Sequence, residues 1–196
     1  MTAWQKMRMS MVGRALFWAG VLVGGLGATV PAQDPSPPTG VIDTMNDPTI
    51  WTVYKDDKVV KVEVATTEAK SGKAIGVTYE MGGGAWLGLF KSIDQDITGY
   101  KGVRFAYRGE GNANSLEFKL EDNDGSIYGK ILGTKSNVGS WTVVEIPFAD
   151  LSYWWGGDSK LAWDHVHNLH FAVSKKGGED KGGAGEVSIS QLEFYK

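Results

Sequence analysis

Residues 115–131 read SLEFKLEDNDGSIYGKI, and this stretch decides the fold. Apolar and charged side chains alternate along its first half with a period of two, which is typical of a β-strand with one buried face. A turn, DNDG, follows, and the alternation then resumes. The apolar sets of the two strands coincide if Glu121 pairs with Ser126. Leu120 then faces Ile127, and we expect a hairpin in this register.

The same period appears upstream in residues 102–108, and short β-favouring segments recur along the rest of the chain. These segments are 41–43, 51–54, 59–67, 74–79, 85–91, 142–148, 169–174 and 186–195. Glycine-rich connections separate them. A change of parity near Ser190 and Gln191 indicates a β-bulge in the last segment. We therefore expect an all-β fold, an antiparallel sandwich of two sheets that forms a single domain over residues 41–196.

The N-terminal residues 1–32 have the three parts of a secretory signal peptide. Basic residues precede an uncharged apolar run, residues 15–28, and the small residues Val30 and Ala32 stand before a cleavage position. The apolar run is shorter than the ~20 residues that a membrane-spanning helix needs, so a cleaved signal peptide is favoured over the alternative, an uncleaved membrane anchor. We expect no membrane span after signal removal, a secreted or periplasmic location, and a Pro-rich exposed leader over residues 33–40.

The composition excludes several classes of site and partner. The chain has no cysteine, so it has neither a disulfide nor a thiolate zinc site. Residues 1–32 hold three of the 20 basic residues and no acidic residue, which leaves 17 basic against 23 acidic residues, a formal charge of −6. This acidic balance argues against binding to nucleic acid or to anionic membranes.

Aromatic residues gather in the connections between strands. A saccharide presents flat apolar ring faces bordered by hydroxyl groups, so its binding site needs exposed aromatic rings beside polar side chains. The sharpest signal is Tyr153-Trp154-Trp155 before two glycines, because three consecutive side chains of an extended segment cannot all face one core. In the alternative, one or two of them plug the end of the sandwich. Trp86 and Trp163 also lie in or beside glycine-rich connections and are candidates for the same role.

Polar residues occupy the other side of the predicted strands. If the strands pair as expected, one outward surface gathers Arg104, Arg108, Glu117, Lys119, Glu121, Tyr128, Lys130 and His170. This surface is a candidate ligand platform. Solvated ion pairs between neighbouring strands would explain the same charges without a ligand.

Residues for zinc binding or catalysis do not fall in suitable positions. His165 and His167 share one side of their strand, whereas His170 has the opposite parity. The DNDG turn has no glutamate at the twelfth position of an EF-hand loop, and the turn itself explains these residues. Glu117 and Glu121 are about 13 Å apart by strand rise, beyond the ~5–9.5 Å between glycosidase carboxylates. We expect no catalytic activity.

Four stretches carry a resemblance to a known family: DITGYKGVRF (96–105), LEDNDG (120–125), WTVVEIPFADL (141–151) and GEVSISQL (185–192). In this order they resemble the family 11 carbohydrate-binding modules. More loosely, they resemble galactose-binding-like jelly rolls that include the complex I intermediate-associated protein 30 family. The resemblance implies a jelly roll with a sugar groove across the outward face. It also implies a structural calcium ion near the first strand, with Asp43 and Asp47 as ligands.

Together these observations favour an exported, non-catalytic protein that binds a polysaccharide or oligosaccharide, such as a β-glucan, by aromatic stacking and polar contacts. The alternative is a structural or assembly protein of the envelope that binds a protein partner through the same sheet face. A glycoside hydrolase or lyase is the third hypothesis. No cofactor other than calcium is expected.

Overall fold

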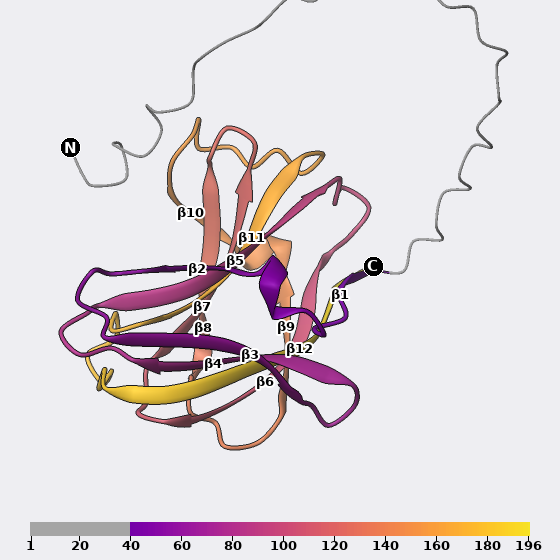
Figure 1. The fold of residues 1–196 in the computed structure, drawn as a ribbon. Helices are drawn as coiled ribbons and strands as arrows, with labels where there is room; N and C mark the ends of the chain where they lie inside the picture. Colours follow the sequence, from indigo (N-terminus) through magenta and orange to yellow (C-terminus); the bar gives the residue numbers. More distant parts are fainter. Residues whose placement is uncertain (1–39) are drawn as a thin grey trace, which may run out of the picture. The chain divides into compact units, whose positions relative to one another are not determined.

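The computed structural model describes residues 40–196, which form two antiparallel sheets packed face to face (Figure 1). The first sheet contains, in spatial order, β3 (Lys61–Glu68), β4 (Lys73–Glu80), β12 (Ala184–Tyr195), β6 (Gly102–Gly111) and β9 (Thr142–Pro147), with β1 (Val41–Asp43) also paired to β12. The second contains β10 (Ser152–Trp155), β8 (Ile127–Lys135), β7 (Ser115–Asp122), β11 (Val166–Ser174), β5 (Trp86–Gln95) and β2 (Thr52–Lys55). Two 3-10 helices, η2 (Pro48–Ile50) and η3 (Phe148–Asp150), complete the fold. The predicted two-sheet antiparallel sandwich is confirmed.

The core lies between the sheets and is built by the alternating apolar residues. Phe105 of β6 meets Phe171 of β11 edge-on, with ring centroids 4.9 Å apart, and Phe118 of β7 packs beside both. All three are at most 3 % exposed. Because successive side chains of a strand point to opposite faces, burial of Phe118 turns Glu117 and Lys119 to the outer face of the second sheet. Burial of the apolar side chains in the core thus places the polar side chains of the same strand on the outer face of the sheet.

The hairpin of β7 and β8 has a register that differs by one residue from the predicted one. Glu121 pairs with Ile127, and Leu120 pairs with Tyr128. The prediction assumed a four-residue turn, whereas Asp122 still bonds Ser126 across a three-residue loop. Gly125 closes that loop with φ of +86°, a conformation that glycine adopts without strain. Tyr128 and Lys130 therefore lie on the core side of β8 rather than on its outer face.

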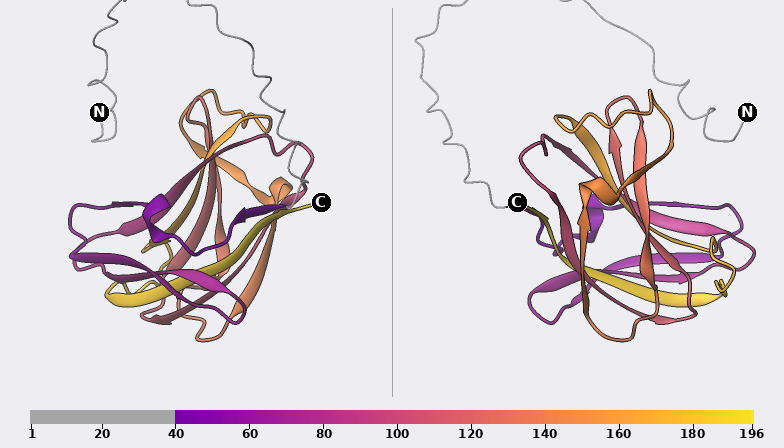
Figure 2. Two further views of the ribbon diagram at one scale, coloured as in Figure 1. Left: turned by 45° about the vertical axis from the view of Figure 1, so that its right-hand side comes forward. Right: turned by 180° about the vertical axis from the view of Figure 1, so that it is seen from behind.

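The predicted bulge in the last strand is present. The pairing of β12 with β6 shifts between Ser190 and Glu193, and Gln191 has a positive φ of 55°. On the second sheet, β10 and the loop that follows it lie against the β7–β8 hairpin in each view (Figure 2).

The predicted signal peptide, residues 1–32, lies outside the described residues, as does all of the 33–40 leader except Gly40. Within residues 40–196, no helix has the length and apolar character needed to cross a membrane.

Candidate functional site

Six polar side chains form a buried row on the outer face of the second sheet. They come from its two central strands: Glu117, Lys119 and Glu121 from β7, and Asn168, His170 and Ser174 from β11. Each is at most 8 % exposed. Polar groups at this depth are costly unless they are hydrogen-bonded, so their partners determine what the site can do.

Glu117 is the centre of one half of the row. Its carboxylate lies 2.8 Å from Lys119 Nζ and 3.1 Å from Lys176 Nζ, and it accepts a 2.5 Å hydrogen bond from Ser174 Oγ. Burial opposes the negative charge, but the Lys119 ammonium and these hydrogen bonds more than offset it, and the pKa of Glu117 is lowered. The carboxylate is therefore ionised and held by two cations.

Glu121 organises the other half of the row. Its Oε2 lies 3.0 Å from His170 Nε2 and accepts a 3.1 Å hydrogen bond from Asn168 Nδ2. Burial opposes ionisation here too, but these two hydrogen bonds outweigh it and lower the pKa of Glu121. Burial lowers the pKa of His170, so its ring is neutral at neutral pH. A neutral imidazole that donates through Nε2 suits the ionised carboxylate.

This pair predicts a pH-dependent stability. A histidine whose pKa is lowered on folding stabilises the protein above the ordinary imidazole pKa of about 6.5, and this stability is lost as the pH falls through the folded-state value. Between about pH 6.5 and the folded-state pKa, we expect His170 to lower the free energy of unfolding by up to ~1.4 kcal/mol for each unit by which the pH falls. Denaturant unfolding at several pH values measures the slope of the free energy of unfolding against pH. His170→Gln should flatten it and the exposed His165→Gln should not; an equally steep slope in both variants would contradict the assignment.

Five aromatic side chains flank the row: Tyr54 of β2, Trp86 and Phe90 of β5, and Trp154 and Trp155 of β10. The Lys119 ammonium lies among three of them. Its Nζ is 5.9 Å from the ring centroid of Tyr54, 5.4 Å from that of Trp154 and 5.9 Å from that of Trp155, within cation–π range. Since β2 and β10 are opposite edges of the sheet, rings from both edges reach its centre.

The two tryptophans of β10 have different surroundings. Lys176 Nζ lies 4.2 Å from the ring centroid of Trp154, so this cation covers one face of that indole. Trp155 packs 5.7 Å from Trp154 and remains 43 % exposed. Trp155 therefore presents an open ring face, whereas Trp154 is held between charged and aromatic neighbours.

Tyr54 is placed by the lack of a side chain at Gly88. A Cβ at Gly88 would lie 2.6 Å from Tyr54 Cζ, so glycine lets the ring lie close over β5. The ring meets His170 edge-on at 5.6 Å. Its hydroxyl is buried and has no hydrogen-bond partner in residues 40–196, and burial raises the pKa of Tyr54. This protonated hydroxyl can donate a hydrogen bond, but no group in the described part of the chain accepts it.

Seven of the residues expected at the site lie together here: Trp86, Glu117, Lys119, Glu121, Trp154, Trp155 and His170. Tyr128 instead lies on the core side of the sheet because of the changed register, and Tyr153, which is 43 % exposed, pairs with it on that side. Tyr128 donates a 2.6 Å hydrogen bond to the carbonyl of Ser159. Trp163 stacks 5.0 Å from Phe148 and packs against the core.

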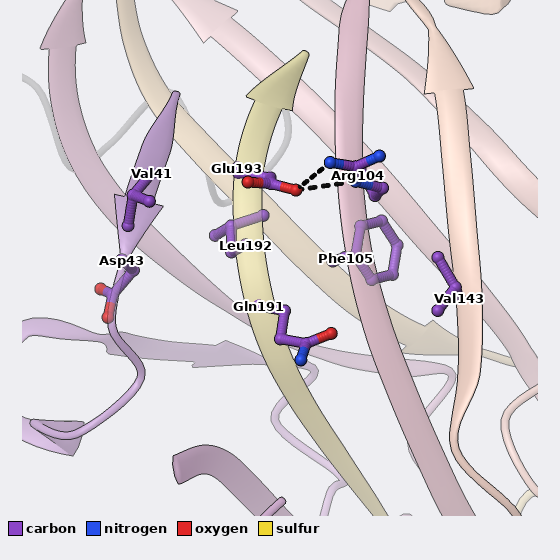
Figure 3. A pocket seen from close by; sticks show the side chains of 8 residues that line it. All are labelled: Val41, Asp43, Arg104, Phe105, Val143, Gln191, Leu192 and Glu193. Carbon is purple, nitrogen blue, oxygen red and sulfur yellow. Dashed lines mark hydrogen bonds and ion pairs between the residues drawn. The ribbon is translucent and has the colours of Figure 1, made fainter. Parts of the chain in front are cut away.

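Arg104 and Arg108 belong to β6 in the first sheet, so the expectation that they neighbour Glu117 is wrong. Arg104 Nε lies 2.7 Å from Glu193 Oε1, and the pair borders a hollow of about 540 Å³ on that sheet (Figure 3). Arg108 lies 5.6 Å from the Trp141 ring. Alternation predicts which side of a strand a residue occupies, but not which sheet the strand joins.

Five members of the site were not predicted: Tyr54, Phe90, Asn168, Ser174 and Lys176. Tyr54 has a signal in the sequence, because it follows Trp51 by three residues. An odd separation on a strand puts one side chain outward when the other is buried, as Trp51 is. Lys176 stands in a loop after β11, where periodicity carries no information.

The two expected calcium ligands already have other partners. Asp43 lies 2.5 Å from Lys91 Nζ and accepts a 2.5 Å hydrogen bond from the amide of Met45. Asp47 caps η2 by accepting a 2.9 Å hydrogen bond from the amide of Thr49. Within the described part of the chain, no three His, Asp or Glu side chains are grouped so as to hold a metal ion. A calcium ion at Asp43 would have to displace the Lys91 ammonium.

Comparison with known proteins finds a family model and solved structures that are similar to this chain. The family model described as "Carbohydrate binding domain (family 11)" matches residues 37–191. Among curated proteins, none matches the chain.

Solved structures share the fold. A family 11 carbohydrate-binding module from Clostridium thermocellum, in complex with a beta-1,3-1,4-mixed-linked tetrasaccharide, has a TM-score of 0.65 at 18 % identity, with 79 % of this chain and 94 % of that chain covered. The family 30 module of a cellulosomal cellulase of the same organism has a TM-score of 0.60 at 13 % identity, with 80 % and 96 % covered. At these identities the likeness concerns the fold alone.

Proposed function

Since this chain belongs to the family 11 carbohydrate-binding domains, we propose that it is an exported, non-catalytic module that holds a β-glucan chain on the outer face of the second sheet. The observation that carries the proposal is the group of rings, Tyr54, Trp154 and Trp155, around the buried Lys119. Aromatic faces suit the apolar faces of pyranose rings, and the polar row beneath them suits the hydroxyl groups at the ring edges.

The balanced charges of the row favour an uncharged ligand. The protonation states of its carboxyl groups favour binding of that ligand without cleavage. Two carboxylates and two ammonium groups balance, so the row offers hydrogen bonds without a net charge. A glycosidase needs one carboxylic acid kept protonated by a raised pKa. The pKa values of Glu117 and Glu121 are both lowered, so neither residue is a proton donor at neutral pH.

A β-glucan is the proposed polymer because a structurally similar module was solved with a beta-1,3-1,4-mixed-linked tetrasaccharide. The test is calorimetric titration of the purified protein with mixed-linked β-glucan, xylan, mannan and pectin, together with an assay for released reducing sugar. Saturable binding to the β-glucan without sugar release is expected. Release of sugar would favour a hydrolase or lyase, and no binding by a folded sample would favour a protein partner.

Tyr54→Phe is expected to weaken sugar binding while leaving the free protein as stable or more stable. The variant keeps the ring and removes a buried hydroxyl that has no partner, a group that costs ~1–3 kcal/mol when left unsatisfied. If a sugar hydroxyl satisfies it, the affinity should fall about tenfold, near 1.4 kcal/mol. Calorimetric titration and thermal unfolding measure the two effects.

Tyr128→Phe is the matched control, because the hydroxyl of Tyr128 already donates to Ser159. This variant should lose some stability and keep its affinity. Equal sugar affinity in Tyr54→Phe and the parent would remove the tyrosine hydroxyl from the proposed site.

Export is proposed from the signal-peptide pattern of residues 1–32. The mass of the protein recovered from the exported fraction of a secreting host tests it. A chain that begins at Gln33 is expected, and an uncut chain retained inside the cell would contradict the proposal.

A further inference from the structure

Lys91 is a charged residue at a core-facing position of β5. It pairs with the fully buried Leu169 of β11, and residues paired directly across antiparallel strands share a face, so Lys91 points between the two sheets. Leu87 and Leu89 precede it on the same side of β5 and belong to the core. The Lys91 side chain is 16 % exposed. Because an ammonium at this depth is costly without an opposite charge, a paired carboxylate must offset the cost.

The first sheet supplies that carboxylate. Asp43 of β1 pairs with the fully buried Leu192 of β12, so its side chain also points between the sheets. Asp43 Oδ2 lies 2.5 Å from Lys91 Nζ, and the Asp43 side chain is 2 % exposed. Asp43 Oδ1 accepts a hydrogen bond from the amide of Met45, a residue with a positive φ of 58°. This one carboxylate therefore joins β1 to the second sheet and fixes the turn of the chain after β1.

The ion pair lies where the resemblance to family 11 modules implies a structural calcium ion. A calcium ion takes about six to eight oxygen ligands, and its affinity depends on their charge. Asp43 supplies one carboxylate, whose two oxygens already have partners. Glu193 and Gln191 line the neighbouring hollow (Figure 3), but Glu193 is paired with Arg104 and Gln191 is uncharged. These residues therefore do not form a calcium site while the Lys91 ammonium is present.

We propose that the Lys91 ammonium takes the place of this calcium ion as a covalently attached cation, so that the fold does not depend on calcium. A bound metal stabilises a protein according to its free concentration relative to Kd. An ammonium carried by β5 needs no such supply, and it keeps Asp43 paired at every calcium concentration. Since both cations require the same carboxylate, removal of the ammonium should make Asp43 available to calcium.

Thermal unfolding with calcium and with a chelator tests the proposal without any sugar, so the outcome is independent of the proposed function. The purified parent should have the same Tm in both conditions. Lys91→Ala should lower the Tm in chelator by roughly 10 °C, because it leaves the Asp43 carboxylate buried without its cation. The shorter side chain leaves space beside that carboxylate, and calcium at about a hundredfold excess over Kd should restore ~5–10 °C of the loss.

Two further variants complete the test. Lys130→Ala is the matched control, because Lys130 Nζ lies 2.7 Å from Asp150 in an ion pair whose side chains are 35 % and 46 % exposed. It should change the Tm little and give no calcium response. Asp43→Asn/Lys91→Met removes both charges, so it should be more stable than Lys91→Ala in chelator and should not respond to calcium. If Lys91→Ala does not fold in chelator, the proposal requires that calcium restores its folding. A parent that calcium stabilises, a Lys91→Ala variant that calcium does not stabilise, or a double variant that calcium stabilises would overturn the proposal.

Discussion

Replacing Glu117 with Ala is expected to lower the free energy of unfolding by about 3–5 kcal/mol, because it leaves the Lys119 ammonium buried without its carboxylate. Lys119 is 5 % exposed and cannot reach water without repacking Tyr54 and Trp154, whose rings lie around it. Lys176 is half-exposed and stays solvated. For a domain of this size, the loss corresponds to a Tm lower by roughly 10 °C. Thermal and denaturant unfolding measure both quantities.

The double variant Glu117→Ala/Lys119→Met separates a stranded charge from a simple loss of packing. Methionine has a similar length and no charge, so the double variant should recover most of the stability that Glu117→Ala loses. The single variant Lys119→Met is the complement. It leaves Glu117 with Lys176 and Ser174, so it should cost less than Glu117→Ala. A double variant no more stable than Glu117→Ala would show that packing around the carboxylate, rather than its charge, dominates.

The alternation of residues 115–121 could be predicted to give a buried face and a polar face, because a period of two depends only on local backbone geometry. The register of the hairpin could not be predicted as readily. A three-residue loop with Gly125 in the left-handed region and a four-residue turn fit the same letters, and the apolar pattern alone preferred the wrong one. This one-residue difference moved Tyr128 from the outer face to the core side.

The membership of the site depended on strand order, which is a non-local property. β6 and β7 are consecutive in sequence but belong to different sheets, so Arg104 and Glu117 do not share a surface. Conversely, β2 and β10 are far apart in sequence, and only their places at opposite edges of one sheet bring Tyr54 and Trp154 to the same lysine. The residue types of the site could therefore be predicted, whereas its full membership required the topology.

Trp155→Ala is expected to reduce the affinity for the β-glucan about 30-fold or more, near 2 kcal/mol, with little change in stability. Its ring is 43 % exposed, so the free protein loses little buried area, but a stacked sugar ring would lose its platform. Trp154→Ala should lower both affinity and stability, because Trp154 packs on Lys176 and Trp155.

The comparison of these two variants tells a stacking platform from a plug at the end of the sandwich. Calorimetric titration gives the affinities and thermal unfolding gives the Tm values. Trp141→Ala is the matched control, since Trp141 is a half-buried indole with a nearby cation, Arg108, on the first sheet. It should leave the affinity unchanged. A Tm in Trp155→Ala that falls by as much as in Trp154→Ala, with unchanged sugar affinity, would mean that both tryptophans serve the fold and that the ligand binds elsewhere.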